Sequence, residues 1–334
     1  MKKNYNNKKR RYQRYFLFAA ALICLIILIN IGLIYAQESK GAIKGELLVE
    51  IKRGAGDLNL VSPTAFTVDS AENVLICDCG AKKVLKVNAS DRKVFNYFSY
   101  AGTEIGDNHI SNIAASRSGY IYLADAESNL VHKFSADGKY IGVIGRDKEK
   151  KLIKKIRYIF TDNSSNLVVI DSLEHKILLF DEDMKPTGEI RIPISDMIFS
   201  YVCGTDDSNS VYISSLKGNK FDVMKADDIK TPLYSKQCSP EEKEAIIAEC
   251  RVIGFDAKNN AYAKAYLVDK NGEEVAHYLV KFVRETQGYK KLKISPGRDQ
   301  QHIKILKPFV VLSEDVVLSY EIDSGSFRLL AYKF

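Results

Sequence analysis

The chain has 334 residues, of which 46% are hydrophobic and 27% are charged, and its formal net charge is +7. Seven lysines and arginines in residues 1–36, a segment without acidic residues, account for this whole excess, because the remainder carries 42 basic and 42 acidic side chains. A formally neutral remainder lacks the clustered positive charge that phosphate backbones require. We therefore exclude nucleic-acid binding.

An apolar run at residues 16–36 follows the basic segment and is interrupted only by Asn30. About 20 apolar residues in a helix cross a hydrocarbon core of about 30 Å, and the preceding basic cluster stays cytoplasmic. We predict a cytoplasmic tail at 1–15, a transmembrane signal anchor at 16–36 and a linker at 37–44. This places the chain in the cell membrane as a single-pass protein with its remainder outside the cytoplasm. A leader cleaved before Gln37 is the alternative, although its apolar core would exceed the usual length of about 7–15 residues.

Residues 45–334 contain a repeat whose period is close to that of propeller blades. Each copy holds a five-residue window that ends in Asp or Ser, and successive end points are separated by 47, 46, 44, 50 and 57 residues. The end points are Asp69, Ser116, Asp162, Asp206, Asp256 and Ser313. Polar turns and β-rich runs follow the windows, so that each copy reads as one four-stranded antiparallel blade.

The last copy supplies only three strands, at 309–312, 316–322 and 327–333. A spare strand at 45–51 precedes the first copy. Pairing it with the last copy closes the ring and removes two exposed edges. The sequence therefore predicts an all-β fold, a six-bladed β-propeller closed by an N-terminal strand and preceded by one transmembrane helix.

The clearest copy lies between Gly119 and Gly142. It reads Gly-Tyr-Ile-Tyr-Leu-Ala-Asp from Gly119 to Asp125, then His132-Lys133-Phe134 and Asp137-Gly138-Lys139-Tyr140-Ile141-Gly142. This segment resembles an NHL repeat of the six-bladed β-propeller type, and weaker copies extend the resemblance over nearly everything beyond residue 45. The resemblance implies that the propeller serves as a binding platform. Because a minority of such propellers are metal-dependent lactonases or lyases, it also implies an enzyme of that kind as the second expectation.

Three aspartates, Asp78, Asp125 and Asp171, close the second strand of the first three copies. One carboxylate per blade is typical of an acceptor for backbone N–H groups in a tight turn, whereas catalytic carboxylates need distinct environments. The five histidines show neither H-x-E nor H-x-x-x-H spacing. We predict no catalytic residue, no metal ligand and no cofactor. A divalent cation such as calcium, held by side chains that converge on the channel, is the alternative.

Five cysteines lie beyond the predicted anchor, and their disulfide pairing stays open. They are Cys77, Cys79, Cys203, Cys238 and Cys250. The Cys77-Asp78-Cys79 segment is either a C-x-C metal or redox pair or two small thiols on one face of a strand, and we favour the structural interpretation.

A helical insertion is predicted near 229–249. Ser239 can serve as its N-cap, and Pro240 suits the first helical position. We expect this insertion to pack on the propeller, with partner docking as the alternative role.

The residue one step before each window enters the innermost strand and, by analogy with propellers generally, rings one mouth of the central channel. The six positions are Thr64, Ser111, Arg157, Tyr201, Arg251 and Lys307. Three of them are cationic, which favours an anionic ligand such as a carboxylate or an acidic glycan. Ordinary solvated loop cations are the alternative.

These patterns favour a membrane-anchored extracytoplasmic β-propeller that acts as a ligand- or protein-binding or scaffold module. Its expected partners are an envelope protein, a peptide or an anionic glycan. The alternative is a metal-dependent, lactonase-like hydrolase or lyase of the six-bladed propeller class. Carboxylates and amides that converge on one cation would favour the enzyme, whereas a cationic mouth would favour binding.

Overall fold

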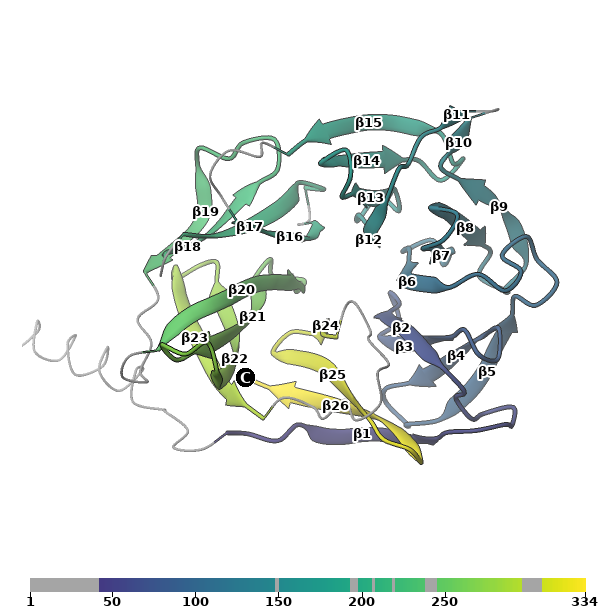
Figure 1. Ribbon diagram of the computed structural model, residues 1–334, viewed down its shortest axis with the longest axis horizontal. Coiled ribbons are helices and arrows are strands. Elements are labelled where there is room, and N and C mark those ends of the chain that lie inside the picture. Colours follow the sequence, from purple (N-terminus) through teal and green to yellow (C-terminus); the bar gives the residue numbers. More distant parts are fainter. Residues whose placement is uncertain are drawn as a thin grey trace, which may run out of the picture. The chain divides into compact units, whose positions relative to one another are not determined.

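The computed structural model describes residues 42–147, 150–192, 198–205, 208–217, 220–237, 245–295 and 308–334. In these ranges the chain forms strands and turns without any helix, and hence without a helix suited to crossing a membrane. Six four-stranded antiparallel sheets surround a common centre (Figure 1). The predicted all-β six-bladed propeller is therefore confirmed. The predicted anchor at 16–36 and the tail at 1–15 lie outside the described residues.

In blades 1 to 5 the chain runs from the innermost strand outward, so that consecutive strands pair. Blade 1 consists of β2 (Pro63–Val68), β3 (Asn73–Asp78), β4 (Lys83–Asn88) and β5 (Val94–Ser99). Blade 2 consists of β6 (Ile110–Ala115), β7 (Ile121–Asp125), β8 (Leu130–Phe134) and β9 (Tyr140–Ile144). Blade 3 consists of β12 (Ile156–Thr161), β13 (Leu167–Asp171), β14 (Lys176–Phe180) and β15 (Pro186–Arg191). A ribbon of β10 (Arg146–Asp147) and β11 (Lys150–Lys151) precedes blade 3.

The second half of the ring repeats this order. Blade 4 consists of β16 (Ile198–Thr205), β17 (Val211–Lys217), β18 (Lys220–Lys225) and β19 (Pro232–Gln237). Blade 5 consists of β20 (Ile246–Phe255), β21 (Ala261–Val268), β22 (Glu274–Val283) and β23 (Gly288–Ile294). Blade 6 consists of β24 (Val310–Ser313), β25 (Val316–Ile322), β26 (Ser326–Lys333) and the N-terminal strand β1 (Glu46–Lys52).

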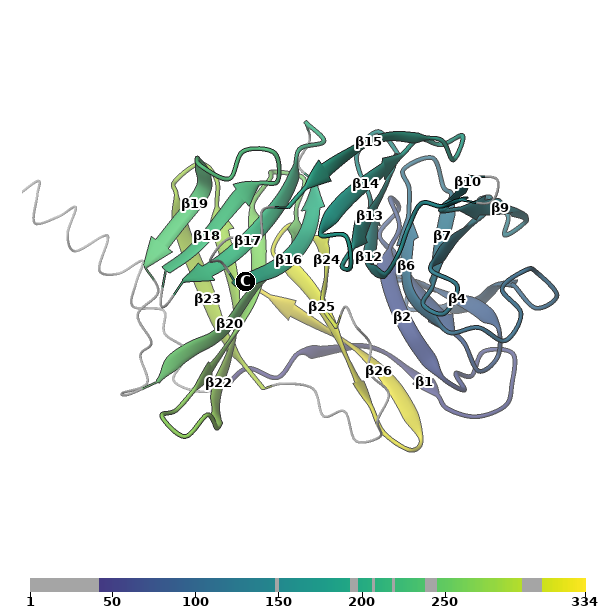
Figure 2. The same ribbon diagram turned by 45° about the horizontal axis from the view of Figure 1, so that its top comes forward.

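The N-terminal strand β1 closes the ring, as predicted. It pairs antiparallel with β26, placing Ile51 opposite Phe327 and Glu50 opposite Arg328 (Figure 2). Arg328 Nε lies 2.9 Å from Glu50 Oε1. The residues just before β1 reach blade 5 as well, because the N–H of Ile43 donates to the carbonyl of Lys293 over 2.7 Å. One N-terminal segment thus ties blade 6 to blade 5.

The hydrophobic core lies mainly between neighbouring blades, and aromatic pairs mark several of the boundaries. Phe98 of blade 1 stacks on Phe134 of blade 2 with ring centroids 5.0 Å apart. Gly138, in the turn between β8 and β9, has a φ of +79°, and a Cβ there would lie 2.3 Å from Phe98 Cβ. This turn therefore requires glycine both for its conformation and for the close approach of the two blades.

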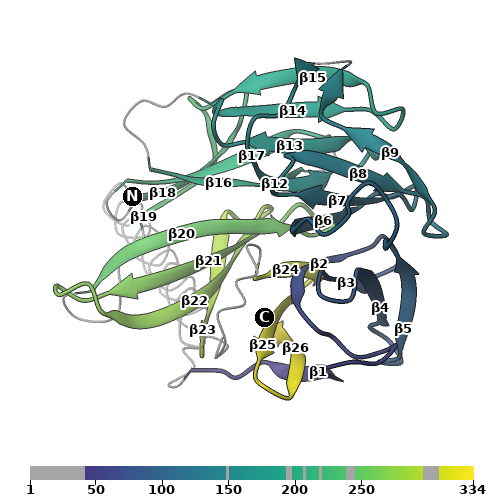
Figure 3. The ribbon, with the colours of Figure 1, turned by 45° about the vertical axis from the view of Figure 1, so that its right-hand side comes forward.

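The helical insertion predicted near 229–249 is wrong where the structure describes that range. Residues 232–237 form β19, and β20 begins at Ile246, while the predicted cap Ser239 lies outside the described residues. The adjacent β-branched pair Ile246-Ile247 favours an extended backbone, and β21 offers a ladder long enough to pair with it. From Ile246 onward, tertiary pairing therefore takes the place of the predicted helix. Figure 3 shows the long strands of blade 5 side by side.

Replacing Ile51 with alanine is expected to lower the free energy of unfolding by about 2–5 kcal/mol, because Ile51 is buried against Phe327 at the ring closure. The measurement is guanidinium unfolding of the full chain. Leu47, on the same strand and 43% exposed, is the matched control, and its alanine variant should change stability by less than about 0.5 kcal/mol. Equal losses in the two variants would contradict a closure held by β1.

Candidate functional site

The repeated aspartates join each blade to the segment that enters it. Asp78 accepts hydrogen bonds from the N–H groups of Val61 over 2.8 Å and Ser62 over 2.7 Å. Asp171 accepts from Lys154 over 2.7 Å and Lys155 over 3.2 Å. Both carboxylates are fully buried. The predicted role of these side chains as backbone N–H acceptors is confirmed.

Asp125 joins blade 2 to its entering segment through a side chain, that of Asn108, and not through backbone N–H groups of that segment. It accepts hydrogen bonds from the N–H of Glu127 over 2.8 Å and from Asn108 Nδ2 over 2.6 Å, and His132 Nε2 lies 3.9 Å away. Burial acts to raise its pKa, but the contacts with His132, Ser128 and Asn108 outweigh burial and hold the pKa of Asp125 well below its usual range. The ionised form is therefore the one that the fold stabilises.

This shift predicts acid sensitivity of the propeller. A carboxylate whose folded-state pKa lies below the unfolded value of about 3.9 stabilises the fold above that pH, and the contribution is lost as the pH falls through and below it. Asp125→Asn is expected to cost about 1–3 kcal/mol at pH 7 and to reduce the loss of melting temperature between pH 7 and pH 3. Thermal melts across this range check the prediction, with the exposed Asp57→Asn as control. An unchanged pH dependence in Asp125→Asn would contradict it.

The structure places the described mouth positions on innermost strands. Thr64 lies on β2, Ser111 on β6, Arg157 on β12, Tyr201 on β16 and Arg251 on β20. The side chain of Tyr201 and the whole of Lys307 lie outside the described residues. Thr64 and Ser111 are buried, and Ser111 Oγ donates to the carbonyl of Ala124 over 3.4 Å. The uncharged side chains of Thr64 and Ser111 are thus packed inside the protein.

The cationic positions of blades 3 and 5 come together. Arg251 Nη1 donates to Tyr158 Oη over 3.1 Å, which links β20 to β12. The guanidinium of Arg157 lies 5.4 Å from the centroid of the same tyrosine ring. Arg251 also pairs with Glu249 on its own strand. Tyr158 therefore connects two of the three cations that the repeat pattern singled out.

A further cation, Lys264, belongs to this group and was missed by the sequence reasoning. It lies on β21 directly opposite Arg251 in the strand register. Its Nζ is 5.5 Å from the ring centroid of Phe309 and 5.8 Å from that of Tyr266. Burial lowers the pKa of Lys264, and Arg251 acts in the same direction, whereas Glu249 and Glu274 oppose the shift. The repeat spacing singles out one position on each innermost strand, so it does not indicate a neighbour that joins the group through strand pairing.

We call Arg157, Arg251 and Lys264 the cation cluster. Glu249 pairs with Arg251 of this cluster. A second carboxylate, that of Glu274 on β22, lies 2.8 Å from His277 Nε2. Among the residues that the structure describes, no group of three or more His, Cys, Asp or Glu side chains is arranged to hold a metal ion. The geometry offers hydrogen-bond donors and positive charge, which suit a carboxylate or another anion.

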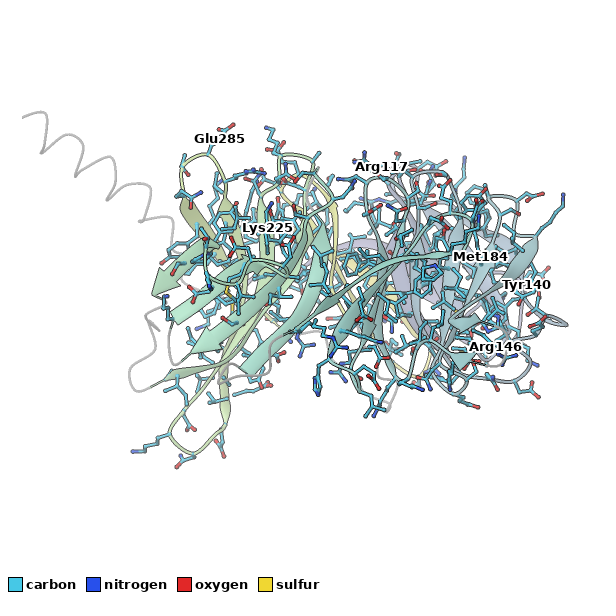
Figure 4. The ribbon with its side chains drawn as sticks, turned by 90° about the horizontal axis from the view of Figure 1, so that it is seen from above. Arg117, Tyr140, Arg146, Met184, Lys225 and Glu285 are labelled. Carbon is cyan, nitrogen blue, oxygen red and sulfur yellow. The ribbon has the colours of Figure 1, made fainter. Side chains whose placement is uncertain are left out.

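The two rims of the ring differ in the connections that form them. Figure 4 shows Arg117, in the turn between β6 and β7, and Glu285, in the turn between β22 and β23, at one rim. Arg146, in the connection from blade 2 to blade 3, lies at the opposite rim. In blades 2 to 5, each innermost strand begins after a connection from the preceding blade, like the connection that contains Arg146. The expected mouth positions therefore belong to the same rim as Arg146.

No protein-family model matches the chain, and no curated protein sequence matches it significantly. Solved structures do resemble it. Virginiamycin B lyase from Staphylococcus aureus has a TM-score of 0.50 at 11% identity, covering 84% of this chain and 98% of its own. The protein U3-55K has a TM-score of 0.50 at 11% identity, covering 87% and 100%. The PQQ-bound aldose sugar dehydrogenase from Streptomyces coelicolor has a TM-score of 0.47 at 14% identity, covering 86% and 97%. At these identities the first two likenesses support the propeller fold alone.

Proposed function

We propose that the chain is a membrane-anchored, extracytoplasmic β-propeller that binds an anionic ligand at the cation cluster and acts by binding rather than by catalysis. The observation that carries the proposal is the hydrogen bond from Arg251 to Tyr158, which holds guanidinium groups from two non-adjacent blades near one aromatic ring. An acidic glycan or a carboxylate-bearing peptide of an envelope partner is the ligand class that fits these groups.

The cluster is suited to an anion because its cations are fixed before a ligand arrives. Arg251 lies mid-strand on β20, Arg157 lies near the start of β12, and Lys264 is half-buried beside two aromatic rings. Partial burial strengthens a charge-assisted hydrogen bond relative to one in bulk water. Arg251 pairs with Glu249 on its own strand, which also fixes the direction of its guanidinium.

Aromatic groups give the cluster a second means of recognition. Tyr266 and Phe309 flank the Lys264 ammonium. Such rings can bury the apolar face of a sugar or a peptide side chain while the cations hold its carboxylate. The likeness to a lyase concerns the fold only and supplies no residue to the enzyme alternative. Binding of this kind requires no cofactor.

Neutralising the cluster tests the proposal. The full-length variant Arg157→Gln, Arg251→Gln, Lys264→Gln is expected to bind a fluorescent oligogalacturonate at least about tenfold more weakly than the parent chain. Affinity of the parent chain should fall as salt rises, because the contact is between charges. Fluorescence anisotropy at two salt concentrations gives both quantities, with neutral maltohexaose as the uncharged probe.

A matched control removes the same charge from the opposite rim. Lys93, Arg117 and Lys258 are exposed and lie in turns between β4 and β5, β6 and β7, and β20 and β21. Their triple glutamine variant should keep the affinity of the parent chain for oligogalacturonate. Equal weakening in both triple variants would show a general charge effect and would contradict a site at the cation cluster, as would full retention of affinity in the cluster variant.

The anchor is tested separately. After expression of the full chain, residues 16–36 are expected to keep it in the membrane fraction through an alkaline carbonate wash, because about 20 apolar residues span the bilayer. A variant without residues 1–36 should be released. N-terminal sequencing of the full-length product distinguishes the alternatives, since a product that begins at Gln37 would contradict the uncleaved anchor and show a cleaved leader.

A further inference from the structure

Cys79 occupies a polar pocket formed by three elements. It lies in the turn after β3, and its Sγ accepts a hydrogen bond from the N–H of Ile110 on β6 over 3.2 Å. Thr64 Oγ1, on β2, lies 3.1 Å from the same sulfur. The Cys79 side chain remains partly exposed. The Ile110 N–H and the Thr64 hydroxyl stabilise a thiolate at this sulfur. The carbonyl oxygen of Ile110, 3.5 Å from the same sulfur, acts in the opposite sense because it accepts from the protonated thiol.

Cys77 lies on β3, two residues before Cys79, and is fully buried. Its Sγ is 3.7 Å from Tyr100 Oη, and that hydroxyl donates to the carbonyl of Asp78 over 3.3 Å. Cys77 and Tyr100 are titratable groups that act on Cys79, and Asp78 acts on Cys77. The two residues therefore differ in exposure: Cys79 is partly exposed, whereas Cys77 is enclosed.

The same surroundings separate the pKa values of the two thiols. A hydrogen bond from Cys77 is the largest contribution to Cys79; burial opposes it, and Thr64 and Ile110 assist it, so that the pKa of Cys79 falls to about 6. Burial raises the pKa of Cys77 well above its ordinary value. At pH 7 Cys79 is mainly a thiolate, and Cys77 keeps its proton.

Blades 2 and 3 carry other residues at the positions that Cys77 and Cys79 occupy in blade 1. The N–H of Cys79 donates to the carbonyl of Ser62, and the residues at the same turn position in blades 2 and 3 are Ala126 and Ser172, which make the equivalent backbone bonds. The turn itself therefore does not require a thiol. A chemically distinct residue at one copy of a structural position indicates a role beyond folding.

We propose that Cys79 is a nucleophilic thiol that forms mixed disulfides with disulfide-bearing small molecules or peptides, with Thr64 and the Ile110 N–H as the hydrogen-bond partners of its sulfur. In this step the Cys79 thiolate attacks one sulfur of R–S–S–R. A new bond forms between Cys79 Sγ and that sulfur, the original S–S bond breaks, and its electron pair leaves on R–S⁻. No other oxidant is needed, and the leaving thiolate takes up a proton from water.

The test uses glutathione disulfide with the reduced full-length chain between pH 5 and pH 9. Tandem mass spectrometry assigns the mixed disulfide to Cys79 or Cys77. At pH 7 Cys79 is expected to react at least about tenfold faster than Cys77, and its rate should reach a plateau above about pH 7 instead of rising toward the ordinary thiol value of about 8.5. Equal reactivity of the two thiols, or a midpoint near pH 8.5, would overturn the proposal.

Two variants test the origin of the reactivity. Thr64→Val removes a hydrogen-bond partner of Cys79, and Cys77→Ala removes the neighbouring thiol. Each is expected to shift the midpoint of the pH–rate profile upward, while thermal melting shows that each variant remains folded. Ser111→Ala changes the equivalent position of blade 2 and should leave the profile unchanged. If the midpoint stays at its original value in both Thr64→Val and Cys77→Ala, the reactivity of Cys79 does not come from these neighbours, and that part of the proposal is contradicted.

Discussion

The antiparallel pairing of β1 with β26 is the constraint on which the rest of the ring depends. Without β1, blade 6 would expose the edge of β26 and the buried face of Phe327. The same N-terminal segment hydrogen-bonds to blade 5 through Ile43. Because each blade buries its apolar faces against its two neighbours, closure of one gap fixes the positions of all six. The chain thereby couples its first folded strand to its last.

Within that ring, the aspartates that recur in the first three copies serve the backbone, and the proposed chemistry is carried by residues that depart from the repeat. Asp78 and Asp171 hold incoming segments through paired N–H contacts. Arg251 stands where blade 2 has Ser111, and it reaches Tyr158 of blade 3. Cys79 stands where blade 2 has an alanine. Because the blades are rigid and repeat the same strand arrangement, residues that differ from the repeat, such as Arg251 and Cys79, are held at fixed positions.

Much of the fold could be predicted from the sequence because blades are local structures. The strands expected at 309–312, 316–322 and 327–333 match β24, β25 and β26 to within one residue at each end. The helix expected near 229–249 is replaced by strands at 232–237 and from Ile246 onward, because pairing of Ile246–Phe255 with β21 is a long-range interaction. The Ser-Pro-Glu-Glu signal at 239–242 lies outside the described residues. Lys264 belongs to the candidate site because it lies opposite Arg251 in the strand register. Tyr158 belongs to it because it contacts Arg251 of a non-adjacent blade. The spacing of the repeat encodes neither relation.

Hydrogen–deuterium exchange of the full chain tests the central claim most directly. If β1 is an integral strand of blade 6, the amides of Glu46–Lys52 should be protected to the same degree as their partners in β26 and should exchange together with them as denaturant is added. Protection of β26 alone, with β1 exchanging at the rate of an open segment, would contradict a ring closed by its N-terminal strand.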